Sequence, residues 1–130
     1  MEVVWDPWRM EFILGAKAMN CFVCEALKTG VSPETLVLYV TRHTVVMLNR
    51  YPYISGHLMV IPHRHVASLS DLGKEEMEDL HETLRSTTEV VKRVLSPDGV
   101  NLGMNLGKAA GAGLEDHIHW HVVPRFMGDS

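Results

Sequence analysis

The chain has 130 residues, the size of one domain, with a hydrophobic fraction of 46% and a charged fraction of 22%. These fractions are ordinary for a globular protein and argue against extended disorder. Twelve basic residues against sixteen acidic ones give a formal net charge of −4, which argues against a broad nucleic-acid surface. No apolar run approaches the roughly 18 residues of a membrane span, and the first residues lack the pattern of a secretory signal, so we expect an intracellular, cytoplasmic protein.

The patterns along the chain predict three strands, one long helix and two further strands. Residues 1–30 are interpreted as an irregular entry, with a short helix possible after Pro7. Segments rich in β-formers predict strands at 35–40, 44–48, 57–61, 100–106 and 117–124. Between the third and fourth, residues 74–95 carry apolar side chains at helical spacing and acidic residues in the first turn. This order predicts an α+β fold, an antiparallel sheet with one long helix.

Three histidines near the C-terminus alternate with apolar residues: His117, His119 and His121. Alternate side chains of a strand share one face, about 6.6–7 Å apart, so the pattern predicts a row of imidazoles. The opposite face then carries the apolar side chains of Ile118, Trp120 and Val122. Such a row is typical of a site where one histidine attacks phosphorus, or of a metal site. The alternative is an exposed polar face with no specific function.

A loop of small residues, 105–114, comes directly before the histidine row. Its glycines allow backbone N–H groups to converge on an anion, and Lys108 adds a positive charge. We interpret this loop as a phosphate-binding loop, with an ordinary turn as the alternative.

The row and the segments around it resemble the histidine-triad (HIT) family, whose motif His-φ-His-φ-His-φ-φ (φ apolar) is matched in full by residues 117–123. Residues 48–60 resemble the family segment that carries the ribose-binding Asn and the central strand. Residues 110–113, the terminal 123–129 and the opening Trp5 to Met10 look most like diadenosine tetraphosphate phosphorylases and fragile-histidine-triad hydrolases. The resemblance covers nearly the whole chain and implies a single HIT domain over residues 1–130.

One departure from that branch lies at the C-terminus. Its members usually continue after Gly128-Asp129 with a further apolar segment, whereas this sequence stops at Ser130. We expect any substrate contact from such a segment to lie outside this sequence.

The resemblance implies an enzyme that cleaves adenine dinucleoside polyphosphates or related AMP-like compounds through a nucleotidyl-histidine intermediate, as a hydrolase or a nucleotidyltransferase. His119 would be the nucleophile, His121 would sit against the phosphate, and His117 would orient the row. The nucleotide-binding residues it implies are Asn49, Asn105, Gly107, Gly111, Ala112, Gly113, Leu114 and His121. It also implies a homodimer. The alternatives are a nucleoside phosphoramidase, a nucleotide-binding regulatory module with little turnover, and a metalloenzyme in which all three histidines of the row bind one ion.

Cys21 and Cys24 have the spacing of half a zinc site. Family members with this pair complete the site with a histidine before the helix and the first histidine of the motif, so the resemblance implies a structural zinc bound also by His65 and His117. His63 is the nearest rival of His65. The alternative is a reduced, buried cysteine pair without metal. A redox role is less favoured because no βαβ unit surrounds the pair.

Overall fold

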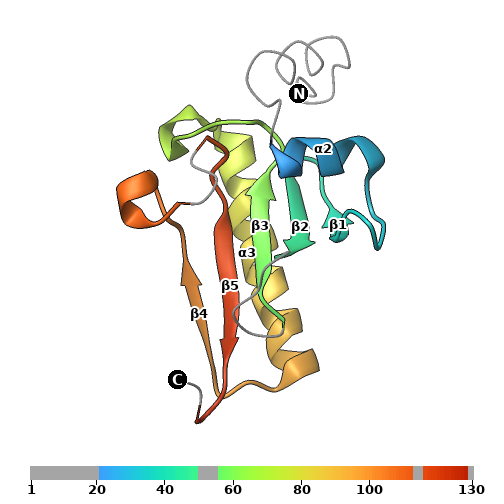
Figure 1. Ribbon diagram of the computed structural model, residues 1–130, viewed down its shortest axis with the longest axis vertical. Coiled ribbons are helices and arrows are strands. Elements are labelled where there is room, and N and C mark those ends of the chain that lie inside the picture. The colour runs from blue at the N-terminus through green and yellow to red at the C-terminus, as the bar shows by residue number, and fades with distance from the viewer. Residues whose placement is uncertain (1–20, 50–55, 113–115, 129–130) are drawn as a thin grey trace.

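The computed structural model describes residues 21–49, 56–112 and 116–128, and its sheet has five antiparallel strands (Figure 1). The elements are α2 (Phe22–Thr29), β1 (Val37–Val40), β2 (Thr44–Leu48), β3 (Leu58–Pro62), the 3-10 turn η2 (Leu69–Asp71), α3 (Lys74–Leu95), β4 (Gly99–Gly103), the 3-10 turn η3 (Lys108–Ala110) and β5 (Trp120–Arg125). The strand order β1-β2-β3-β5-β4 inserts the last strand of the chain between β3 and β4. The predicted α+β architecture is confirmed.

The long helix α3 covers one face of the sheet and lies behind it in Figure 1. Leu80, Leu84 and Val91 of α3 belong to one buried cluster with Val60 of β3 and Val122 of β5. The helical stripe expected from the sequence is therefore buried along the middle of the helix. Three residues of that predicted stripe are exposed instead: Met77, Val94 and Leu95.

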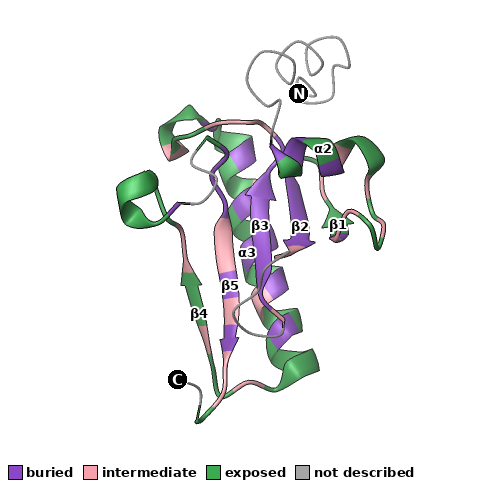
Figure 2. Cartoon of the chain, viewed as in Figure 1, coloured by how far each residue is buried: buried purple, intermediate pink, exposed green. Residues whose placement is uncertain are grey.

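The opposite face of the sheet carries the histidines. Met47 of β2 pairs with Met59 of β3, and Met59 pairs with His121 of β5. Directly opposite residues of antiparallel strands share a face, so these three side chains form one row on the side that α3 leaves free. Figure 2 shows that β3 is buried along its length while the edge strand β4 is mostly exposed.

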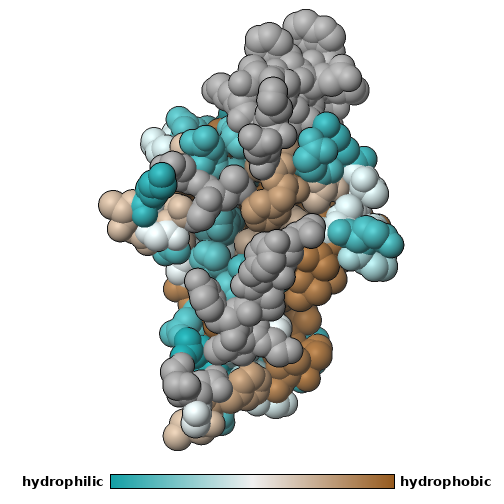
Figure 3. All heavy atoms as spheres, in the orientation of Figure 1, coloured by the Kyte–Doolittle hydropathy of each residue, from teal (hydrophilic) through white to brown (hydrophobic). Residues whose placement is uncertain are grey.

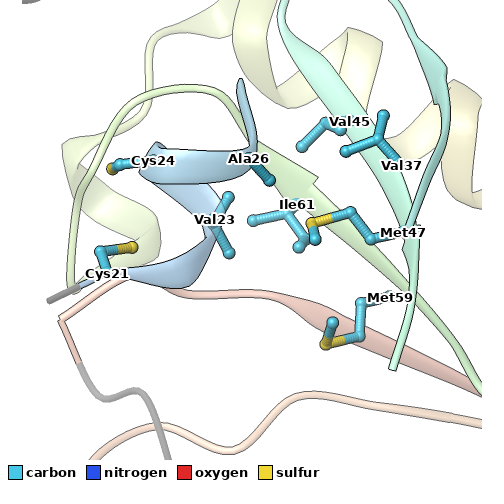
Figure 4. Packing of buried hydrophobic residues seen from close by; sticks show 9 residues of the cluster. All are labelled: Cys21, Val23, Cys24, Ala26, Val37, Val45, Met47, Met59 and Ile61. Carbon is cyan, nitrogen blue, oxygen red and sulfur yellow. The ribbon is translucent and has the colours of Figure 1, made fainter. Parts of the chain in front are cut away.

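The short helix α2 covers one end of this histidine-bearing face. Its buried residues Val23 and Ala26 pack against Val45, Met47 and Ile61 of the sheet (Figure 4). The interpretation of residues 1–30 as an irregular entry is therefore wrong for 22–29. Apolar side chains three residues apart, closed by a glycine, are a helix signal, and tertiary burial completes it. The short helix expected after Pro7 lies outside the described residues.

Two strand boundaries also differ from the sequence prediction. β5 begins at Trp120, so His117 and His119 lie in the segment just before the strand rather than inside it. β4 ends at Gly103, three residues earlier than predicted, because its pairing with β5 runs only from Gly99 to Gly103. The predicted separation of faces still holds, since Ile118 and Val122 are buried on the side of α3 and Trp120 packs partly against the same cluster.

Among the described residues, neither α3 nor the shorter α2 combines the length and the hydrophobicity that crossing a bilayer requires.

Candidate active site and candidate metal centre

A backbone hydrogen bond defines the tautomer of the His119 ring. Its Nδ1 lies 2.9 Å from the backbone oxygen of His117. A carbonyl oxygen can only accept, so Nδ1 carries the proton and Nε2 carries the lone pair. The ring is buried, with 8% of the residue exposed, and burial lowers its pKa below the ordinary value. The chain thus holds a neutral imidazole with its nucleophilic nitrogen fixed in advance.

His121 lies between two other imidazoles. Its ring centroid is 4.9 Å from that of His119, and its Nδ1 is 2.8 Å from Nε2 of His57. Burial, with smaller contributions from His119 and His57, lowers the pKa of His121 to about 4. At neutral pH the His121 ring is therefore uncharged and acts by hydrogen bonding rather than as a cation.

His57 is the site residue that the sequence analysis missed. It precedes β3 and is 2% exposed. Its Nε2 is 3.5 Å from the side-chain nitrogen of Asn49. Burial lowers its pKa as well. It alternates with Met59 and Ile61 on the histidine-bearing face, and a histidine at a position of inward-facing apolar residues was the available signal.

The residues between Asn105 and Ala112 form a tight loop, and several of its backbone N–H groups donate hydrogen bonds within the loop. The N–H groups of Ala110 and Ala112 both donate to the oxygen of Gly107, and that of Gly111 donates to Lys108. Gly111 has φ +95°, the left-handed region that favours glycine. Its oxygen accepts from the Asn105 side chain at 3.5 Å. The predicted residues Gly113 and Leu114 lie outside the described part of the chain.

An apolar pocket of about 300 Å³ opens between α2 and the C-terminal end of β2. It is lined by Phe22, Glu25, Ala26, Glu34, Thr35, Leu36, Met47 and Leu48. Met47 connects it across the sheet, through its pair Met59, to His121. An apolar slot, a polar amide and the histidines therefore follow one another on one face.

Cys21, Cys24, His65 and His117 converge where the first turn of α2 meets the end of β3. Their ligand atoms all lie within 4.8 Å of one another. The Sγ atom of Cys24 is 3.4 Å from Nδ1 of His65 and 3.7 Å from Nδ1 of His117, and Sγ of Cys21 is 3.4 Å from the latter nitrogen. A tetrahedral zinc with ordinary Zn–S and Zn–N bonds has sulfur-to-nitrogen edges of about 3.6 Å. The three sulfur-to-nitrogen distances are close to that value.

The protonation of His117 also fits a metal ligand. Its Nε2 lies 2.7 Å from the backbone oxygen of Pro62, so Nε2 carries the proton and Nδ1 directs a lone pair at the two sulfurs. This hydrogen bond to the far nitrogen is the usual device that fixes the tautomer and orientation of a ligating histidine. The hydrogen bond from the Cys24 thiol lowers the pKa of Cys21, against the opposing effect of burial.

The nearest rival for the metal, His63, has another role. Its Nε2 donates to the backbone oxygen of Thr44 at 2.9 Å, and burial lowers its pKa to about 4. Within the described chain, the four-residue group includes His117 but neither His119 nor His121. The row is thus divided: its first member faces the cysteines and the other two face the open side of the sheet.

His117 belongs to both sites. Its side chain contacts the cysteines, and its backbone oxygen accepts the proton-bearing nitrogen of His119. The structure brings every described residue that the sequence assigned to the metal together, and it brings His119, His121 and Asn49 onto one face.

Comparison with known proteins places these features in a family. The family model described as "HIT domain" matches residues 30–128. An "AP-4-A phosphorylase" of Mycobacterium tuberculosis is 37% identical over 138 residues, covering 100% of this chain and 71% of that protein. A "Bis(5'-nucleosyl)-tetraphosphatase [asymmetrical]" of Schizosaccharomyces pombe is 36% identical over 93 residues, covering 72% of this chain and only 50% of that longer protein. Among solved structures, a zinc-bound histidine triad family protein from Mycobacterium smegmatis superposes with a TM-score of 0.71 at 30% identity, covering 87% of this chain and 80% of that one.

Proposed function

The chain belongs to the HIT domain family, and from that premise we propose that it is an enzyme that cleaves dinucleoside polyphosphates or related nucleotidyl compounds through a nucleotide bound covalently to His119. The observation that carries this proposal is the 2.9 Å hydrogen bond from His119 Nδ1 to the backbone of His117, which leaves Nε2 as a neutral nucleophile. The names of the relatives support the substrate class, since one is an AP-4-A phosphorylase and another a bis(5'-nucleosyl)-tetraphosphatase.

The first step is attack by Nε2 of His119 on the α-phosphorus of the nucleotide. A P–N bond forms, the bond from phosphorus to the bridging oxygen breaks, and the rest of the polyphosphate leaves. The Nδ1–H that already donates to His117 stabilises the positive charge that the ring acquires in this step. In the second step water or inorganic phosphate attacks phosphorus, the P–N bond breaks, and His119 is regenerated.

The neighbouring residues orient the substrate in this proposal. His121, held by the 2.8 Å contact with His57, lies against the phosphate near the leaving oxygen. Asn49 binds the ribose, and the apolar pocket that Met47 helps to line takes the base. Asn105 and the loop 107–114 contact the phosphates, and Lys108 and Arg50 contact the distal ones. Arg50, Gly113 and Leu114 lie outside the described residues.

A zinc ion at Cys21, Cys24, His65 and His117 is part of the proposal. The distances and the tautomer of His117 support it, and so does the zinc-bound relative. Two thiolates and two imidazoles form a closed tetrahedral site, which is structural rather than catalytic. When bound, the ion supplies a rigid cross-link that fixes α2 to the end of the sheet.

We also propose that two copies associate edge to edge through β4, the edge strand next to β5. Leu102 of β4 is 46% exposed, and an exposed apolar edge strand favours pairing with another chain. Apolar surface also gathers at the C-terminal end of α3 (Figure 3), where Val90, Val94 and Leu95 are exposed. In sedimentation experiments Leu102→Lys should shift the protein toward monomer. A cytoplasmic location stays a prediction. A single domain over residues 1–130 stays a prediction as well.

Rapid acid quench followed by mass spectrometry tests the covalent step. Incubation with diadenosine tetraphosphate should produce an adenylylated protein, and the adduct should map to His119. Products identify the acceptor, because water yields AMP and ATP whereas inorganic phosphate yields ADP and ATP. Turnover without any adduct, or an adduct that persists in His119→Ala, would contradict the proposal.

A further inference from the structure

Leu36 has a backbone conformation that residues with a side chain rarely adopt. Its φ is +66°, and the other described non-glycine residue with a positive φ is Ser96, at the C-cap of α3. In this left-handed region the Cβ atom lies too close to the following carbonyl oxygen, so the usual residue is glycine or asparagine. A leucine in such a strained position is a pointer to a functional role of its side chain.

Hydrogen bonds on both sides hold the backbone of Leu36 in this conformation. Its N–H donates to the backbone oxygen of Ser32 at 3.1 Å, and its oxygen accepts from the N–H of Leu48 in β2 at 2.9 Å. A bond from a left-handed residue to the carbonyl four residues earlier is the one that closes a glycine-capped turn. The turn therefore requires a left-handed residue at this position, but it does not require a leucine side chain.

The hydrophobic core does not account for the leucine either. Among the described residues, Leu36 belongs to neither buried cluster, nor to the partly buried side chains that pack against them. The next residue, Val37, is 1% exposed and makes the core contact of this part of the chain. Leu36 instead lines the apolar pocket between α2 and β2, together with Met47 and Leu48. The side chain is therefore available to a ligand in that pocket.

We propose that Leu36 is a specificity-determining residue, whose side chain contacts the base of the bound nucleotide and favours a purine over a pyrimidine. This inference rests on the proposed function, in which the pocket takes the base. The free energy of apolar contact grows with the area that is buried, so the larger purine ring gains more from the leucine than a pyrimidine does. Because hydrogen bonds already fix the backbone of Leu36, binding does not have to order this part of the pocket.

Two pairs of variants separate the contact with the base from the backbone strain. Leu36→Ala and Leu36→Gly both remove the contact, but only glycine also relieves the strain at φ +66°. Leu38→Ala and Leu38→Gly are the matched controls, since Leu38 of β1 is 49% exposed, lies outside the pocket and has no positive φ. Leu36→Gly should have a higher Tm than Leu36→Ala. At Leu38 the order should be reversed, because glycine without a positive φ only adds freedom to the unfolded chain.

Calorimetric titration of the whole chain with AMP and with UMP tests the contact and the base preference. Both Leu36 variants should bind AMP about tenfold more weakly than the wild type, the loss expected when a partly buried leucine is truncated. They should bind UMP only about threefold more weakly, because a pyrimidine covers less of the side chain. Both Leu38 variants should bind AMP and UMP as the wild type does. In turnover of diadenosine tetraphosphate, the Leu36 variants should show a raised KM rather than a lowered kcat, because a contact with the base is the same in the ground state and the transition state.

Several results would overturn the role of Leu36. Wild-type affinity for AMP in both Leu36 variants would show that the side chain does not contact the base, and equal losses for AMP and UMP would show that it does not select the purine. A lower Tm for Leu36→Gly than for Leu36→Ala would show that no strain is relieved. If the wild type binds AMP with the expected preference but cleaves no dinucleotide, the proposed function fails while the role of Leu36 stands. If it binds neither nucleotide, both fail.

Discussion

A valine at Gly111 tests whether the shape of the loop before the histidine row matters for turnover. Gly111 has φ +95°, and among the described residues an added Cβ meets the Asn105 side chain, at 3.7 Å, which is ordinary contact. The cost of Gly111→Val is therefore backbone strain rather than a clash. A side chain in the left-handed region costs about 1–2 kcal/mol, which corresponds to a factor of about 5–30. The residue is exposed and held by its own turn bonds to Lys108 and Asn105, so the strain falls on the loop rather than on the core.

We expect kcat/KM for diadenosine tetraphosphate to fall by about 5–30-fold in Gly111→Val. Lys108→Ala should reduce it by less than about fivefold, because an exposed charge contributes at most about 1 kcal/mol. Gly128→Val is the matched control, since Gly128 has nearly the same φ, +94°, and an added Cβ there meets none of the described atoms within 4 Å. It should retain turnover. Wild-type turnover in Gly111→Val, or a larger loss in Lys108→Ala, would refute the argument that loop geometry positions the phosphate.

Three further predictions concern the histidines and the metal. His119→Ala should abolish both turnover and the adduct, and removing His121 in addition should add little, because residues that act as one unit show non-additive losses. Turnover of His119→Ala near the wild-type rate would show that His119 is not the nucleophile. Burial lowers the pKa of His119 below its ordinary 6.5, so the neutral nucleophile persists in mildly acid solution and is lost as pH falls through the lowered value. The acid limb of kcat/KM should therefore lie below pH 6.5, and a limb above it would be inconsistent with a buried neutral ring. Elemental analysis should find about one zinc per chain, and chelation should lower Tm. An unchanged Tm would remove the structural role.

The sequence by itself determined the elements whose pattern is local. Residues 74–95 form a helix with the predicted bounds because apolar spacing and an acidic first turn act within the segment. The alternation around His117, His119 and His121 determined which side chains face α3, since strand geometry leaves only two faces. The spacing of Cys21 and Cys24 likewise indicated half of a metal site before any partner was placed.

Tertiary structure decided what local pattern leaves open. The α2 helix was missed because its eight residues are too few to be stable alone, and burial of Val23 and Ala26 against the sheet completes it. His57 received no role because its partner His121 is 64 residues away, and only the register of β3 against β5 brings the two rings together.

The division of the histidine row is also a tertiary result. Nothing in the alternation distinguishes His117 from His119, yet the first contacts the cysteines of α2 and the second is not part of that group. The His117 ring donates to the backbone oxygen of Pro62 in β3. The His119 ring donates to the backbone oxygen of His117. A backbone acceptor carries no signature in the sequence, and so the tautomers, and with them the roles of the three histidines, are set only when the strands are assembled.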